Sequence, residues 1–246
     1  MNRFKNDGFT IVELMTALAV GLIIMSAIYA MVNLSQKSSA GIGRKVLTQQ
    51  DARSVLDFMS MEIAMATYNP NLNVTWSGYM SGSCSSVNML QTRTGIQSAG
   101  SNTIGIAMDI GGLIDGTGAN VPSGKIGDAP NEYIIYSYDA TNAAITRDVT
   151  CGGAQVILGS DSSTMVRNNL SGTPLFQYFN RTGTDISASV IATPDVAAGS
   201  GGIKDIRIIR INIVVDVVSG QGKQFQVSRR TYTTDVMLRN HALANH

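Results

Sequence analysis

The sequence predicts an α+β protein in which one long N-terminal helix, membrane-spanning in its first half, packs on an antiparallel β-sheet head. Three observations predict this fold class. No charged residue occurs from Leu14 to Gln36, and about 20 apolar residues in a helix suffice to cross a bilayer. Apolar residues then recur at helical spacing up to Ala66, and apolar and polar residues alternate near the C-terminus.

The composition bounds the class of protein. The chain of 246 residues can bury a sizeable core. Its 18 basic and 17 acidic residues give a net charge of +1 without a basic run, so nucleic acid is not expected as a partner. Only 14% of residues are charged. Together with abundant Gly, Ser, Thr and Asn, this low charge favours short strands and turns over a helical bundle.

The N-terminal flank predicts a single-pass membrane topology. Arg3 and Lys5 stand against Asp7 before the uncharged stretch, which places the flank in the cytoplasm and everything after Lys37 beyond the inner leaflet. Two alternatives are a signal peptide cleaved after Ser38-Ser39-Ala40 and a plain membrane anchor. A plain anchor does not explain Glu13, whose charge at the start of the apolar stretch is energetically costly in a membrane.

The segment Gly8-Phe9-Thr10-Ile11-Val12-Glu13-Leu14 resembles the processing site of type IV prepilins. The resemblance implies that residues 1–8 are a leader peptide, removed by a prepilin peptidase that cuts between Gly8 and Phe9. It also implies N-methylation of the new Phe9 amine. Glu13 then becomes the fifth residue of the mature chain.

The new amine supplies a partner for Glu13. It is at least partly cationic at neutral pH, and Glu13 lies one helical turn from Phe9. The carboxylate can compensate its own amine before assembly and a neighbour's amine within a filament. Because an unpaired buried charge is penalised, this pair would set the axial register of the stem. The alternative is that Glu13 is merely tolerated at headgroup depth.

One helix is predicted from Phe9 to about Tyr68, ended by Pro70. It divides into a transmembrane and filament-core half, 9–33, and an amphipathic half, 34–68. Gly41 and Gly43 are weak points where it would bend. Charged residues, Glu62 among them, are assigned to faces other than the apolar stripe. The stripe comprises Ile42, Val46, Gln49, Ala52, Leu56, Met59, Ile63 and Ala66. A short coiled-coil stalk is the alternative.

Two further segments resemble minor pilins. The run from Gln50 to Tyr68 is similar to the W-type minor pilins, the PilW family, with Thr67 where that family often has Gly. The ending Val236-Met237-Leu238-Arg239-Asn240 is similar to the V-x-L-R-N ending of minor pilins. The resemblance implies a low-copy subunit that primes a type IV pilus or forms its tip complex, with roles in motility and cell adhesion.

The same resemblance implies partners and a location. The partners are prepilin peptidase, other minor pilins, the major pilin and the inner membrane. The head would lie in the periplasm and then at the cell surface as part of the pilus. A minor pseudopilin of a type II secretion system has the same stem chemistry and remains an alternative. A membrane-anchored adhesin or enzyme is the alternative of another class.

The head, 69–246, is predicted to be β-rich. Residues 132–138 and 144–147 form a hairpin. Residues 203–218 form a strand with one buried and one largely polar face and a bulge near Ile208. A turn at 219–222 leads into a last strand, 225–238. The glycine-rich segment 111–131 is expected to be a surface loop or flexible insertion.

Reactive chemistry is sparse in the sequence. Cys84 and Cys151 predict a disulfide in an oxidising compartment, with free thiols as the alternative. His241 and His246 stand in a tail expected to be solvated. Calcium binding by Asp109, Asp115 and Asp128 is weighed and not adopted, since their spacing fails the EF-hand pattern. No catalytic residue, metal site or cofactor is predicted, and the chain is expected not to be an enzyme.

Overall fold

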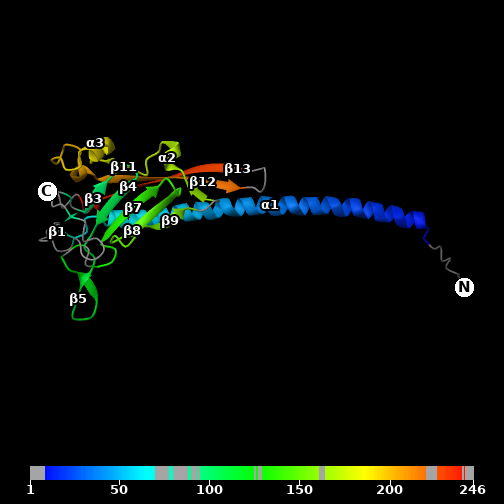
Figure 1. Cartoon of the computed structure of the whole chain (residues 1–246), viewed down its shortest axis with the longest axis horizontal. Helices are drawn as coiled ribbons and strands as arrows, with labels where there is room; N and C mark the ends of the chain where they lie inside the picture. The colour runs from blue at the N-terminus through cyan, green and yellow to red at the C-terminus, as the bar shows by residue number, and fades with distance from the viewer. Residues whose placement is uncertain are drawn as a thin grey trace.

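A computed structural model describes residues 9–246 except 70–77, 80–87, 90–92, 94, 125, 127–128, 161–163, 220–225, 240 and 242–246. Its dominant feature is helix α1 (Ile11–Ala64), which runs for 54 residues without interruption. Gly41 and Gly43 therefore do not break it. The first half of α1 stands away from the rest of the chain, and only the second half enters the head (Figure 1). The predicted α+β fold class is confirmed.

Two antiparallel sheets form most of the head. The first has the order β3-β4-β7-β8-β9. In the second, β12 is central and pairs with β10 and β11 on one side and with β13 on the other. The bounds of the first sheet are β3 (Ile96–Ala99), β4 (Thr103–Ala107), β7 (Tyr133–Asp139), β8 (Ala144–Val149) and β9 (Gln155–Gly159). Those of the second are β10 (Thr164–Val166), β11 (Phe176–Phe179), β12 (Ile208–Ser219) and β13 (Gln226–Met237).

Smaller elements complete the described chain. Two short hairpins pair β1 (Gly78–Tyr79) with β2 (Asn88–Met89) and β5 (Gly112–Ile114) with β6 (Asn120–Pro122). The short helices are α2 (Asn168–Ser171), α3 (Ser187–Ala192) and the 3-10 turn η2 (Ile203–Asp205).

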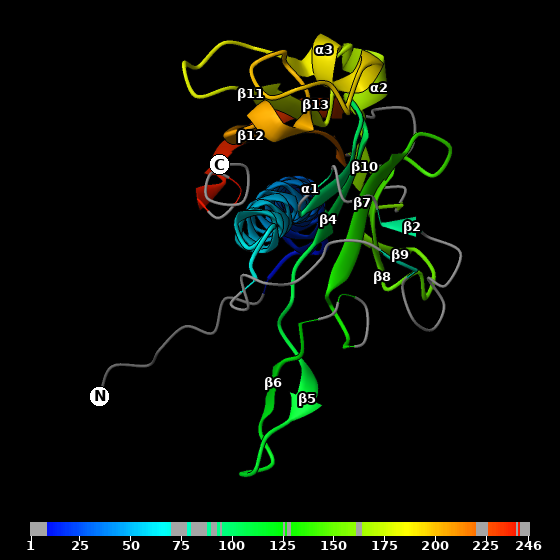
Figure 2. The same cartoon turned by 90° about the vertical axis from the view of Figure 1, so that its left-hand side faces the viewer.

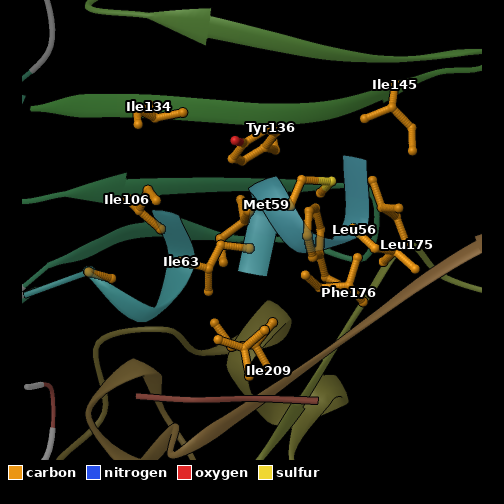
Figure 3. Close-up of a cluster of buried hydrophobic side chains, with 14 of the residues drawn as sticks. Leu56, Met59, Ile63, Ile106, Ile134, Tyr136, Ile145, Leu175, Phe176 and Ile209 are labelled. Carbon is orange, nitrogen blue, oxygen red and sulfur yellow. The ribbon is translucent and has the colours of Figure 1, made fainter. Parts of the chain in front are cut away.

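The second half of α1 lies between the two sheets (Figure 2). Met59 and Ile63 face Tyr136 of β7 on one side and Phe176 of β11 on the other (Figure 3). Burying one helix against two apolar sheet faces unites the head in a single core. The packing also fixes the direction in which the stem leaves the head.

The predicted apolar stripe is confirmed in its C-terminal part. Its members from Ala52 to Ala66 are buried in the core. Ile42 and Val46, by contrast, are 61% and 47% exposed. The head begins to cover α1 only at Thr48, whose hydroxyl lies 3.0 Å from that of Thr164 in β10. The stripe therefore extends beyond the part of the helix that the head covers.

The C-terminal hairpin differs from its prediction in two respects. The strand begins at Ile208, because Ile203–Asp205 forms the turn η2. The predicted bulge near Ile208 is wrong, since the register of β12 and β13 is unbroken from Ile208↔Met237 to Ser219↔Gln226. The hairpin of β7 and β8 is confirmed.

The second face of β12 is largely polar, as predicted, but it is also buried. Asn212, Val214 and Asp216 are all buried. The side chain of Asn168 donates to the Asn212 carbonyl (2.6 Å) and accepts from the Val214 amide (3.0 Å). Asn168 therefore satisfies backbone groups of β12 in the gap between its ladders with β10 and β11.

The glycine-rich segment 111–131 contains the β5–β6 hairpin, which projects from the head (Figure 2). Two fully buried carboxylates hold its base. Asp109 accepts the amides of Ser123 (3.1 Å) and Gly124 (2.8 Å), and Glu132 accepts those of Gly111 (3.0 Å) and Ala129 (3.2 Å). The described part of this segment is thus a structured hairpin on an anchored base.

Candidate functional site: the helix start, the stem and its attachment

The start of the stem is a capped helix end. Thr10 is the N-cap, and its hydroxyl accepts a hydrogen bond from the Glu13 amide (3.3 Å). A threonine followed three residues later by a glutamate is the spacing of a capping box. The negative charge in the first turn also complements the positive end of the helix dipole. Sequence reasoning missed Thr10, although this spacing was the signal that identifies it.

Phe9 and Glu13 lie at this exposed end. Phe9 precedes the helix, which begins at Ile11 rather than at Phe9, and its side chain is 87% exposed. Gly8 lies outside the described residues. Within the described part of the chain, the Glu13 carboxylate makes no hydrogen bond or ion pair. The charge is therefore available to a cation that the chain acquires by processing or meets on a neighbour.

The stem that follows presents apolar side chains in every direction. Along α1, an 18-residue window of the stem has a mean hydropathy of 2.3 and is not buried at all within the protein. This is the one described helix that is long and apolar enough to span a membrane. The large exposed side chains are Phe9, Ile11, Val12, Leu14, Met15, Leu18, Val20, Leu22, Ile23, Ile24, Met25, Ile28, Tyr29, Met31, Val32 and Leu34.

Polar side chains of the stem bond to its own backbone. The Thr16 hydroxyl donates to the Glu13 carbonyl (3.0 Å), and the Ser26 hydroxyl donates to the Ile23 carbonyl (2.8 Å). The Asn33 amide donates to the Tyr29 carbonyl (3.1 Å). Because lipid offers no hydrogen-bond partner, these internal bonds suit the segment to a bilayer or a dry helical bundle.

A buried ion pair attaches α1 to the five-stranded sheet. Glu62 accepts two hydrogen bonds from Arg147 of β8, at 3.0 Å from Nε and 2.6 Å from Nη2. Its carboxylate also accepts the hydroxyl of Tyr136. The Arg147 guanidinium lies over the Phe58 ring, 5.2 Å from its centroid. The prediction that Glu62 decorates another face is wrong, because its side chain points from the helix into the sheet.

The environment of this pair shifts two pKa values. Burial raises the pKa of Tyr136 well above its ordinary value, and the hydrogen bond to Glu62 adds to the shift. Burial alone would lower the pKa of Arg147, but the hydrogen bond and charge of Glu62 outweigh it and raise that pKa. Arg147 therefore stays cationic inside the head.

The C-terminal end of α1 is held by His241. The prediction of a solvated tail is wrong for this residue, because His241 is fully buried. Its Nε2 lies 2.8 Å from the Ile203 carbonyl, and its Nδ1 lies 3.1 Å from the Thr67 hydroxyl. Since a carbonyl can only accept, Nε2 carries a proton that it donates to Ile203. His246 lies outside the described residues.

Thr67 has a backbone conformation that favours glycine. Its φ is 69°, in the left-handed region. Its amide donates to the Ala107 carbonyl (3.0 Å), and a Cβ at Gly95 would lie only 1.9 Å from its hydroxyl. The close approach explains Gly95, and the bond to His241 compensates for threonine at position 67.

The predicted disulfide stays a prediction, because Cys84 lies outside the described residues. The same holds for a calcium site that includes Asp128. Among the residues with described positions, no group of three or more His, Cys, Asp or Glu side chains is placed to hold a metal ion. Asp115 instead caps its own turn, accepting the amides of Thr117 (2.8 Å) and Ala119 (2.9 Å).

Comparison with known proteins gives one match. Residues 3–29 match the family model described as the prokaryotic N-terminal methylation motif. No curated protein and no solved structure matches the chain. The motif supports a type IV pilin or pseudopilin-like protein, processed by prepilin peptidase and anchored by its N-terminal helix. The match ends before the segment that resembles W-type minor pilins.

Proposed function

We propose that the protein is a minor pilin of a type IV pilus, resembling the PilW family and incorporated at low copy to prime assembly or form the tip complex. The observation that carries this proposal is the exposed, capped helix start within the methylation motif, followed by an uncharged, predominantly apolar and unburied stem. Burying such a surface needs either lipid or other stems. The role is assembly rather than catalysis.

In this proposal the chain is used in four parts. Residues 1–8 are the leader, 9–33 the transmembrane and filament-core half of the helix, 34–68 its amphipathic half, and 69–246 the head. The protein first resides in the inner membrane with its head in the periplasm and then enters the pilus. Its partners are the peptidase, other minor pilins and the major pilin, and a disulfide between Cys84 and Cys151 staples the head.

Processing is the first testable expectation. Mass spectrometry of the chain purified from its own membrane should find an N-terminal, methylated Phe9 and no residue of the leader. An intact Met1 would indicate a plain anchor, and a chain beginning at Gly41 would indicate a secreted protein. Either of these results contradicts the proposal.

Deletion of the gene separates the pilus from the secretion machine. Loss of surface pili with normal enzyme secretion supports the minor pilin. The opposite pattern supports a minor pseudopilin of a type II secretion system. A strain with normal pili and secretion would favour a membrane-anchored adhesin or enzyme.

Charge at position 13 is expected to control incorporation. Glu13→Leu and Glu13→Gln should both be processed normally but enter filaments at least about tenfold less, a factor that corresponds to about 1.4 kcal/mol. The physical reason is that neither variant neutralises a neighbouring amine in a dry bundle. Quantitative immunoblots of sheared filaments and of membranes measure the ratio.

The glutamine variant separates two roles of Glu13. Glutamine keeps the size and hydrogen-bonding capacity of glutamate at this position and loses only the charge, while the bond from the position-13 amide to the Thr10 hydroxyl remains possible in both variants. If Glu13→Gln enters filaments as the wild type does and Glu13→Leu does not, Glu13 acts through hydrogen bonding rather than through its charge. Normal incorporation of both variants would refute the register role entirely.

A further inference from the structure

Strand β13 has one backbone edge that pairs with β12 and one that faces outward. In an antiparallel ladder, the N–H and C=O of one residue point to the same side. The Asn212 amide donates to the Leu175 carbonyl (2.8 Å), and the Val214 carbonyl accepts from the Arg167 amide (2.7 Å). Even-numbered residues of β12 therefore point away from β13, and odd-numbered residues point toward it.

This alternation fixes which residues of β13 are unpaired. Odd-numbered residues of β12 pair with even-numbered residues of β13, as in Ile211↔Thr234 and Ile213↔Tyr232. The bond from the Leu238 amide to the Arg207 carbonyl (2.9 Å) continues the pattern. Odd-numbered residues of β13 thus direct their N–H and C=O groups outward, where no described segment receives them. They are Val227, Arg229, Thr231, Thr233, Asp235 and Met237.

The outward edge lacks most of the features that keep sheet edges apart; of its charged residues, Arg230 alone is exposed without an ion pair to any described residue. Proteins usually protect such an edge with proline, a bulge, unpaired charges or a short strand. Strand β13 is 12 residues long, contains neither proline nor glycine, and has an unbroken register. Its outer-face charges are neutralised across the ladder, by Arg229 with Asp216 and Asp235 with Arg210, each at 2.7 Å.

The location of the edge indicates what covers it. The β12–β13 hairpin runs alongside α1 (Figure 1), and β13 is an edge strand because it pairs only with β12 among the described strands. This edge runs along the direction of α1 (Figure 1). Stems that pack side by side in a common membrane would therefore bring a neighbour's head next to it. The uncharged hydroxyl side chains of Thr231 and Thr233 suit a strand rather than an anionic lipid surface.

We propose that the outer edge of β13 binds an extended strand from the head of a neighbouring subunit, which adds to the sheet through backbone hydrogen bonds. This inference rests on the proposed function and names the head surface that it uses. Backbone hydrogen bonds would provide the affinity, and alternate side chains of the added strand would determine which subunit binds. The contact leaves the stem chemistry of Phe9 and Glu13 unchanged.

A proline at position 231 tests the edge. Thr231→Pro removes an outward N–H that the fold does not use, and proline is tolerated at such positions of edge strands. The full-length variant should be processed and keep the urea midpoint of the wild type, yet enter filaments at least about tenfold less. Thr231→Val is the matched control, since it keeps the N–H and should incorporate normally.

Two outcomes of this comparison overturn the proposal. One is normal incorporation of Thr231→Pro, and the other is an equal loss with Thr231→Val, which would assign the effect to the side chain. If the proline variant fails to fold, photo-crosslinking decides. Benzoylphenylalanine in place of Thr231 should link, in filaments, to a strand peptide of another subunit, whereas the same group in place of the exposed Thr141 should not.

The crosslinking experiment also separates the two proposals. The chain could be present in filaments and yet crosslink from position 231 only to lipid, only to stem peptides or to nothing. That result would overturn the proposed binding at the β13 edge but would leave the minor-pilin proposal standing. A wild-type chain absent from filaments overturns both.

Discussion

Replacing Arg147 with methionine is expected to lower the free energy of unfolding by about 3 to 5 kcal/mol. The side chains of Arg147 and Glu62 are only 15% and 11% exposed. Without Arg147, the Glu62 carboxylate keeps one donor, Tyr136, and loses two hydrogen bonds and its counter-charge. Methionine keeps an apolar side chain beside Phe58, but the variant also loses the hydrogen bond from Arg147 Nη2 to Asn131 (2.8 Å) and the guanidinium over the Phe58 ring, so the loss measures all contacts of the guanidinium.

Urea unfolding of the detergent-solubilised full chain, followed by tyrosine circular dichroism, measures this difference. The double variant Glu62→Gln, Arg147→Met is the control, because it removes both charges and leaves Tyr136 an amide acceptor. It should recover at least half of the lost free energy, since paired removal of buried charges is often close to neutral. A loss below about 1 kcal/mol in the single variant would show that water compensates Glu62.

Glu62 also shows where sequence reasoning about the helix ends. Helical spacing correctly placed Met59 and Ile63 in the core, because an apolar stripe must be covered. The same spacing puts Glu62 beside Ile63, but a charge is assigned to solvent unless its partner is known. That partner, Arg147, is 85 positions away in the sequence. No local pattern carries this information.

The residues at the two ends of the helix also differ in whether a local sequence pattern could identify them. Phe9 and Glu13 could be selected from a contiguous motif, and Thr10 was available from its spacing to Glu13. His241 could not, because its contact with Thr67 spans 174 positions. Likewise, the sequence extended the stripe to Ile42, whereas the head begins at the contact of Thr48 with Thr164. Only the tertiary arrangement decides how much of an amphipathic helix is covered.

The head is expected to lose stability steeply above pH 10. Burial raises the pKa of Tyr178 and Tyr136 well above the ordinary value near 10, with the bond to Glu62 adding to the shift of Tyr136. Below pH 10 both tyrosines are protonated in the folded and in the unfolded state, so they do not make the free energy of unfolding depend on pH there. Above it, unfolded tyrosine ionises while the buried hydroxyls do not, and proton release then favours unfolding.

Each such tyrosine contributes about 1.4 kcal/mol per pH unit once the unfolded phenol is fully ionised, so the slope from the two together rises above pH 10 toward about 2.7 kcal/mol per unit. Urea unfolding of the full chain at pH 8, 10, 10.5 and 11 measures the slope. Tyr178→Phe should reduce the slope by up to about 1.4 kcal/mol per unit at the highest pH. It should also be less stable at pH 8, because it loses the bond from the Tyr178 hydroxyl to the Gly100 carbonyl (2.8 Å). A flat profile up to pH 11 would mean that both hydroxyls reach solvent, since only a solvated phenol ionises equally in the two states.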